Sequence, residues 1–365
     1  MAAKGLDPYR YAPVELIGGS TVPEAYRLLA VGRQSLLEGI NFNDMRSIYP
    51  SVAQTAFAVA HLIAPFKVDG LRFVFLGGEI ATFALLVRVL REMGRSPLWS
   101  VVYWWNPLAA YMTIGLVHVD AIIPPLVIAG LLMHAKGRPY MAVWLLGLAA
   151  GVKIWPLLLA PLVIAPLIRT PRKALVACLV LGATLLLAVG PLMWSTLRPG
   201  SGLSAYAGGW SNNNGFYAWM LFGMNTLLGS PEASERVLRL SLGAATAVIA
   251  LAQAFRGDNS IGSIFSRGLI VAASVFYLSP AQFPWYGIWF LPLAALLGNW
   301  PLLLASALLP FYYVFYADWV LDGGSVFFYR IAFIHSLPVL AWLLYDALWR
   351  ARKSERHSFA GTRDH

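Results

Sequence analysis

Long apolar runs separated by short polar or proline-rich segments dominate the chain from residue 70 onward. A membrane-spanning helix needs roughly 20 consecutive apolar residues. We therefore predict an all-α integral membrane protein, a bundle of about eleven transmembrane helices with interfacial helices in its outer loops. Several runs are shorter than a full span, so tilted or broken helices are expected. The predicted spans are 70–90, 98–116, 119–134, 139–152, 154–168, 173–194, 236–255, 266–281, 285–298, 300–317 and 329–349.

The composition agrees with this pattern. Hydrophobic residues make up 59% of the 365 and charged residues 12%, against about 25% charged in soluble proteins. This excludes a soluble enzyme, a disordered chain and a disulfide-stapled domain. The single cysteine, Cys178, cannot form an internal disulfide, and we find no metal-ligand spacing. The net charge is +10, but no basic stretch is interleaved with aromatic residues, so we predict no nucleic-acid partner.

Basic residues predict the orientation, because Lys and Arg gather in cytoplasmic loops. When the 91–97 loop is placed inside and the spans alternate, fifteen Lys and Arg fall on the inner side. Five remain outside after residue 80, namely Lys153, Arg198, Arg236, Arg239 and Arg330. The pattern therefore favours a multi-pass protein of the cell membrane with an outer side rich in aromatic and amide residues.

Three regions follow from this orientation. Residues 1–69 form an extracytoplasmic first-loop segment, in which the run 50–65 is too short for a crossing and is predicted as an interfacial or re-entrant helix. Residues 70–349 form the bundle, with a long outer loop at 195–235, and residues 350–365 form a basic cytoplasmic tail. A polar, basic N-terminal segment does not readily cross a membrane unaided, so we expect a missing upstream helix and an internal Met1.

Asp120 is an isolated acid, since no other lies between Glu92 and Glu232. Ionisable groups near a membrane core are costly and are functional candidates by default. The alternative is an interfacial aspartate that caps the next helix. His118 could orient Asp120 or relay its proton, although a histidine beside a helix end is more often structural. Glu79 is predicted to pair with another helix.

Two isolated cations share the outer side with Asp120. Lys153 lies between apolar runs just before Pro156, where its compact charge could hold a phosphate or snorkel to lipid headgroups. Arg330 could grip a phosphate with two hydrogen bonds or anchor the last span at the interface. Several aromatic residues could stack on sugar rings or form the interfacial belt; they are Trp104, Trp105, Trp210, Trp285, Tyr286 and Trp289.

Five ordered segments carry a resemblance to a known class. They are 5–13, 47–54, 106–108 with 115–120, 151–156 and 279–286. In these segments the chain resembles the GT-C class of membrane glycosyltransferases, and most closely the polyprenyl-phosphate-dependent mannosyltransferases of glycosyltransferase family 87. The chain departs from the family at Ser51, where relatives have proline, and in the spacing of Gly115, His118 and Asp120. An acidic motif expected before the first segment is absent.

The resemblance implies transfer of a hexosyl unit, expected to be mannosyl, from a polyprenyl-phosphate sugar to a glycan or glycolipid acceptor at the outer face. It implies membrane lipids as surroundings and no cofactor besides the donor substrate, and it leaves a metal requirement open. Asp120 and His118 become the catalytic candidates, with Asp7 and Asp44 as secondary acids. The expected substrate-binding residues are Lys153, Arg330, Tyr49, Asn106, Trp210, Gln282, Trp285 and Tyr286.

Two other classes of function stay open at this point. A transporter or flippase for lipid-linked sugars would show repeats and paired charges at the membrane midplane, whereas the sequence gathers its charges on one side and shows no repeat. An inactive, truncated fragment of the glycosyltransferase would explain the absent acidic motif. An in-frame helix with such a motif upstream of Met1 would argue against this fragment reading.

Overall fold

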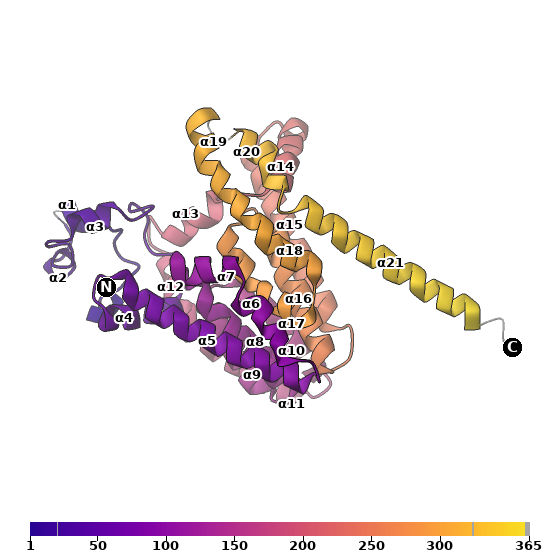
Figure 1. Ribbon diagram of the computed structural model, residues 1–365. Helices are drawn as coiled ribbons and strands as arrows, with labels where there is room; N and C mark the ends of the chain where they lie inside the picture. Colours follow the sequence, from indigo (N-terminus) through magenta and orange to yellow (C-terminus); the bar gives the residue numbers. More distant parts are fainter. Residues whose placement is uncertain (20, 323–324, 362–365) are drawn as a thin grey trace.

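The computed structural model describes residues 1–19, 21–322 and 325–361, and helices account for its regular structure (Figure 1). Among these residues, the β-type pairing is a single parallel bridge between Asn212 and Ala281. The prediction of an all-α chain is therefore confirmed for the described residues.

Short helices make up the segment before the bundle. They are η1 (Ala2–Lys4), α1 (Glu15–Gly18), α2 (Glu24–Arg27) and α3 (Gln34–Glu38), and the last three lie to one side of the bundle (Figure 1). The run predicted at 50–65 is α4 (Ser51–Ile63), which begins after Pro50 and packs along α5. Its 13 residues are too few for a full crossing.

The bundle is built from two groups of packed helices. In the first group α5 (Val68–Glu92) contacts α8 (Ile123–Ala135), α8 contacts α9 (Pro139–Ala150), and α9 contacts α11 (Pro171–Ala188). In the second group α15 (Pro231–Ala254) contacts α16 (Ile261–Leu278), which continues onto α17 (Leu291–Leu297) and then α18 (Trp300–Leu308). The two groups meet where α16 packs on α8. Their shared core includes the fully buried Phe75, Leu131, Phe265, Phe276 and Phe290.

In the described part of the chain, six helices are long and apolar enough to cross a membrane. These helices are consistent with a membrane protein, but a count of about eleven spans is not confirmed. A seventh candidate is a pair of helices, Pro107–Gly115 and Val119–Ala135, that is bent by 109° at the break between them. The six helices are Val68–Glu92, Pro171–Ala188, Pro231–Ala254, Ile261–Leu278, Trp300–Ala317 and Ile331–Trp349.

Two predicted spans are interrupted in the structure. The run 98–116 consists of η2 (Pro97–Ser100), α6 (Val101–Trp104), α7 (Pro107–Ala110) and the π-helix η3 (Tyr111–Gly115). A new helix starts at Pro107 because the Asn106 side chain accepts from the Leu108 amide at 3.0 Å and proline has no amide to donate. The run 285–298 likewise divides into the 3-10 helix η7 (Pro284–Trp289) and the seven-residue α17.

The long connection at 195–235 contains helices. α12 (Gly190–Ser195) precedes it, α13 (Gly202–Gly209) and α14 (Gly215–Leu228) lie within it, and α14 gathers with α19 (Val314–Asp322) and α20 (Ser325–Tyr329) at one end of the bundle (Figure 1). The last helix, α21 (Leu337–Gly361), projects away from the bundle (Figure 1). Short turns complete the chain: η4 (Val119–Ile122), η5 (Trp155–Leu159), α10 (Ala160–Ile164), η6 (Ala165–Leu167), η8 (Leu309–Tyr313) and η9 (Ile331–Phe333).

Candidate active site

Asp120 and Lys153 form an ion pair inside the bundle. The Lys153 ammonium lies 2.8 Å from Oδ1 and 3.0 Å from Oδ2 of Asp120. The side chain of Asp120 is 1% exposed and that of Lys153 is 19% exposed. The carboxylate is therefore fully enclosed, whereas the Lys153 side chain is partly exposed. A charge is tolerated there because its partner and hydrogen bonds replace the lost solvation.

A sharp break in the chain presents Asp120. The π-helix η3 ends at Gly115, and the next helix, η4, begins at Val119 at a steep angle. Between them Val117 has a φ of 52°, a conformation that a β-branched residue rarely adopts. The break is held by the His118 amide, which donates to the Met112 carbonyl at 3.0 Å. Strained backbone of this kind clusters at functional sites.

Lys153 lies at a second break, between α9 and η5. The carbonyl of Gly151 accepts from the amides of Val52 and Ala53, at 3.0 and 3.2 Å. The first turn of α4 therefore rests on the segment that carries Lys153. Pro156 follows in the first turn of η5, where its missing amide costs no helical hydrogen bond. Two segments about a hundred residues apart are thus fixed together beside the cation.

Aromatic rings surround the pair. The Lys153 ammonium lies 4.0 Å from the centroid of the Tyr286 ring and 5.2 Å from that of Trp289. The Trp289 indole N–H donates to Oδ1 of Asp120 at 2.6 Å, and the Tyr286 and Trp289 rings stack at 4.2 Å. We call Asp120, Lys153, Tyr286 and Trp289 the Lys153 box. Aromatic rings attract a desolvated cation, so the stacked pair of rings adds to the hold that Asp120 has on the ammonium.

Further aromatic contacts extend from the box. The hydroxyl of Tyr206, in α13, lies 2.7 Å from that of Tyr286. Burial raises the pKa of the Tyr206 phenol, so this hydroxyl stays neutral at physiological pH. His118 stacks on Trp285 at 4.1 Å. His118, Trp285 and Tyr286 therefore lie together with Asp120 and Lys153.

The other candidate residues take various places. Asn106 caps α7 and donates to the Ser306 hydroxyl at 2.9 Å. Trp210 packs on Tyr206 at 5.3 Å and so reaches the box indirectly. The carbonyl of Tyr49, just before α4, accepts from the Tyr9 hydroxyl at 2.8 Å.

Gln282 and Arg330 lie further along the chain. The Gln282 side chain is buried and lies 2.7 Å from the His335 ring nitrogen. Arg330 is exposed at the start of η9, and no side-chain contact described for it reaches the box. The substrate-binding roles of these residues stay predictions.

Some residues near the box were not singled out from the sequence. Tyr206 lies in the long connection at 195–235 and carries no local signal. Trp155 stacks on Trp289 at 5.4 Å, and its place two residues after Lys153 is the signal that could have found it. Glu79 accepts from the Tyr103 hydroxyl at 3.0 Å, which confirms its predicted pairing with another helix. Among the described residues no three His, Cys, Asp or Glu side chains gather as metal ligands.

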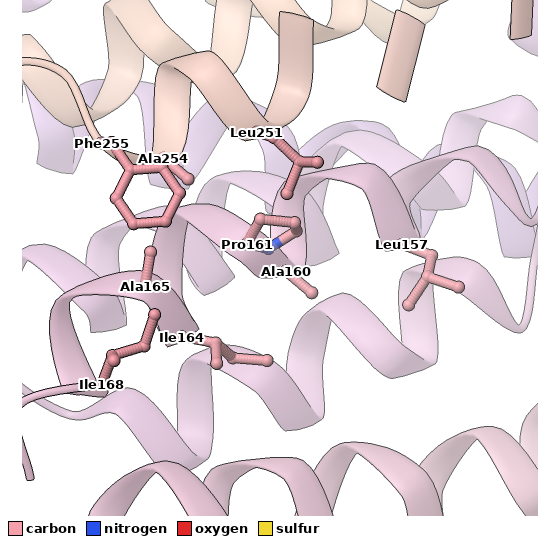
Figure 2. A pocket seen from close by; sticks show the side chains of 9 residues that line it. All are labelled: Leu157, Ala160, Pro161, Ile164, Ala165, Ile168, Leu251, Ala254 and Phe255. Atoms are coloured by element: carbon pink, nitrogen blue, oxygen red, sulfur yellow. The ribbon is translucent and has the colours of Figure 1, made fainter. Parts of the chain in front are cut away.

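An apolar groove begins close to Lys153. Its volume is about 390 Å³, and it lies between the η5–η6 segment and the C-terminal end of α15 (Figure 2). Leu157 lies four residues after Lys153, and Ile168 marks the other end of the lining in sequence. Aliphatic side chains, three alanines, one proline and one phenylalanine line it. The lining is Leu157, Ala160, Pro161, Ile164, Ala165, Ile168, Leu251, Ala254 and Phe255.

Comparison with known proteins supports a class of enzyme. Residues 49–169 match a family described as alpha-(1->6)-mannopyranosyltransferase, N-terminal domain. The matched stretch contains Tyr49, Asn106, Asp120 and Lys153 and so both partners of the ion pair. Neither the curated proteins nor the solved structures give a match. The match therefore supports a glycosyltransferase role for this helical, apolar chain, and specifically a relation to mannosyltransferases.

Proposed function

We propose that this chain is a GT-C-type membrane glycosyltransferase that uses a polyprenyl-phosphate sugar as donor. It moves a mannosyl unit to a glycan or glycolipid acceptor at the outer face of the cell membrane. The observation that carries the proposal is the buried Asp120–Lys153 pair, which lies within the stretch that matches a mannosyltransferase family.

The geometry of Lys153 suits a leaving phosphate. An ammonium group has three N–H donors, and Asp120 accepts from it through both carboxylate oxygens. One donor is left for an anion on the accessible side. Because the aromatic rings of Tyr286 and Trp289 exclude water, a phosphate there would interact strongly with the positive charge of the Lys153 ammonium.

The reaction needs few protein groups. The acceptor hydroxyl oxygen forms a bond to the anomeric carbon while the bond from that carbon to the phosphate oxygen breaks, and the electron pair leaves on the phosphate. A base takes the hydroxyl proton. Asp120 already accepts from Lys153 and Trp289, so we assign it to positioning the cation rather than to removing this proton. His118, stacked on Trp285, is the neighbouring candidate for orienting the acceptor.

The apolar groove suits the lipid part of the donor. A polyprenyl chain is a linear series of apolar units, each of which carries a methyl group. The groove offers almost purely apolar walls (Figure 2). Because the groove begins four residues beyond Lys153, a donor with its phosphate at the box could lay its chain there. The burial of each CH₂ group favours binding by about 0.8 kcal/mol.

A transfer assay tests the proposal. Membranes that contain the chain are incubated with polyprenyl-phosphate mannose labelled in the sugar, and labelled glycan or glycolipid product is measured. We expect transfer by the wild type and none by Lys153→Ala, while the exposed Lys173→Ala serves as the matched control. Transfer no greater than in membranes without the chain would overturn the proposal.

A further inference from the structure

A second cavity, of about 220 Å³, lies at the end of the bundle where α14 meets the outer loops. Asn212, Asn225, Phe222, Pro280 and Tyr329 are among its lining residues. We call it the Asn225 pocket. It shares no lining residue with the apolar groove or the Lys153 box.

Three polar side-chain atoms in the lining residues lack hydrogen-bond partners among the described residues, namely the Tyr217 hydroxyl and two amide oxygens. Oδ1 of Asn212 and Oδ1 of Asn225 are buried, and neither has a hydrogen-bond partner among the described residues. The backbone of Asn212 is fixed, since its carbonyl accepts from the Gln282 amide at 2.9 Å. A buried acceptor without a partner is unfavourable and calls for an explanation. A bound molecule that donates hydrogen bonds from hydroxyl groups would supply one.

The rest of the lining restricts the chemistry of that molecule. None of the residues that line the pocket is charged, so the pocket suits an uncharged ligand. The rings of Tyr217, Phe222 and Tyr329 offer flat apolar surface. A neutral molecule with several hydroxyls and one face of C–H groups is a sugar ring. The volume is below the range of about 300–1,000 Å³ of drug-sized sites, which fits one ring.

The chain connects this pocket to the Lys153 box. Pro280 lines the pocket, and Tyr286 lies against Lys153. Six residue steps separate them, a reach of at most about 20 Å. Because the pocket is within this reach but shares no lining residue with the box, a sugar ring in it would be close to the box and apart from the reacting position. This distance suits an internal ring of an oligosaccharide.

We propose that the Asn225 pocket binds one uncharged sugar ring of the acceptor glycan, as a subsite separate from the Lys153 box. The proposal rests on the proposed function for the identity of the ligand as acceptor. The binding of a sugar ring at the pocket is independent of catalysis and can be measured without it.

Saturation-transfer NMR on the purified chain tests the binding. The probe is methyl α-D-mannopyranoside, and mannitol, which has hydroxyls but no ring, is the control ligand. We expect binding of the mannoside and not of mannitol. Asn225→Leu should weaken binding about tenfold, the value of one hydrogen bond. The matched control is Thr226→Val, because Thr226 is exposed on the same helix and donates to the Phe222 carbonyl.

A second variant guards against misfolding. If Asn225→Leu does not yield folded protein by circular dichroism, Tyr329→Leu removes one ring of the rim and should also weaken binding. Equal binding of mannoside and mannitol, or unchanged binding in a folded pocket variant, would overturn the proposal.

A transfer assay separates the two proposals. Asn225→Leu should raise the KM for an oligomannoside acceptor about tenfold, and Asp120→Asn should abolish transfer while it keeps mannoside binding. If the chain transfers mannose but binds no mannoside at the pocket, the subsite proposal alone is wrong. If the wild type binds the mannoside at the pocket but transfers no mannose, the proposed function alone is wrong.

Discussion

Lys153 lies 33 residues after Asp120 in the chain, yet its ammonium contacts both carboxylate oxygens of that residue, at 2.8 and 3.0 Å. The pair joins two places where a helix is broken. Asp120 lies at one break and Lys153 at the other. Because Asp120 is enclosed and Lys153 is not, removal of either partner should have different consequences for folding and for activity.

The first prediction concerns the stability of this pair. Lys153→Met should lower the free energy of unfolding by about 3–5 kcal/mol, because it leaves a buried carboxylate without its counter-ion. The double variant Asp120→Asn with Lys153→Met should recover much of that loss, since no charge is left unpaired. Unfolding in mixed micelles measures both values. A double variant no more stable than Lys153→Met would contradict the ion pair.

Activity should not follow the same pattern. Both variants should lose transfer, since neither keeps a cation for the leaving phosphate. A double variant that regains both stability and transfer would remove Lys153 from the proposed chemistry.

The second prediction concerns the hydrogen bond from Trp289 to Asp120. Trp289→Phe keeps a ring for stacking on Tyr286 but removes the donor at 2.6 Å. We expect a loss of about 1.5–3 kcal/mol in the free energy of unfolding, as for hydrogen bonds to charged groups, with reduced transfer. Trp300→Phe is the control, because Trp300 is about half exposed at the start of α18. Equal effects of both variants would count against a special role for Trp289.

The third prediction concerns the close approach of α4 at Gly151. A Cβ at Gly151 would lie 2.5 Å from a methyl carbon of Val52 and 2.7 Å from the Cβ of Ala188. Gly151→Ala should therefore destabilise the chain by about 1–3 kcal/mol and lower transfer, because it displaces the segment that carries Lys153.

Gly182→Ala is the matched control for this position. A Cβ there meets nothing within 4 Å, and alanine in a helix interior is favoured over glycine by about 0.5–1 kcal/mol. We expect the control to be neutral or stabilising in the same unfolding assay. A Gly151→Ala chain as stable as the control would contradict the packing of α4 described above.

The fourth prediction concerns orientation. Cys178 is exposed, so Cys178→Ser gives a background without a reactive thiol. In that background Ser211→Cys should react with an impermeant thiol reagent added to intact cells, and Arg138→Cys should react only after the cells are opened. Both positions are exposed. The reverse labelling pattern would place the Lys153 box on the cytoplasmic side.

Much of the helical framework could be predicted from the sequence, because hydropathy sums along one continuous segment. The run predicted at 300–317 coincides with an apolar helix of the same bounds, and the run at 236–255 corresponds to Pro231–Ala254. The runs 98–116 and 285–298 were not continuous. Their average hydropathy hides local events, namely the cap at Asn106 and the prolines that start new helices.

The candidate site was predicted only in part. Asp120 and Lys153 could be singled out because each is an isolated charge in apolar sequence. Nothing local indicated that Trp289 donates to Asp120, or that Tyr206 lies against Tyr286. Aromatic residues are frequent in this chain, so their composition does not show which of them meet.

The sequence by itself determined that the chain is an apolar helical protein with few charges and that three of these charges, Asp120, Lys153 and Arg330, stand alone. The tertiary structure decided that Asp120 and Lys153 form one ion pair, that rings from the distant η7 lie against it, and that Arg330 lies outside it. The physical reason is that apolar content belongs to each segment alone. An ion pair depends on the distance and solvent exposure of two groups, which only the packing of separate segments sets.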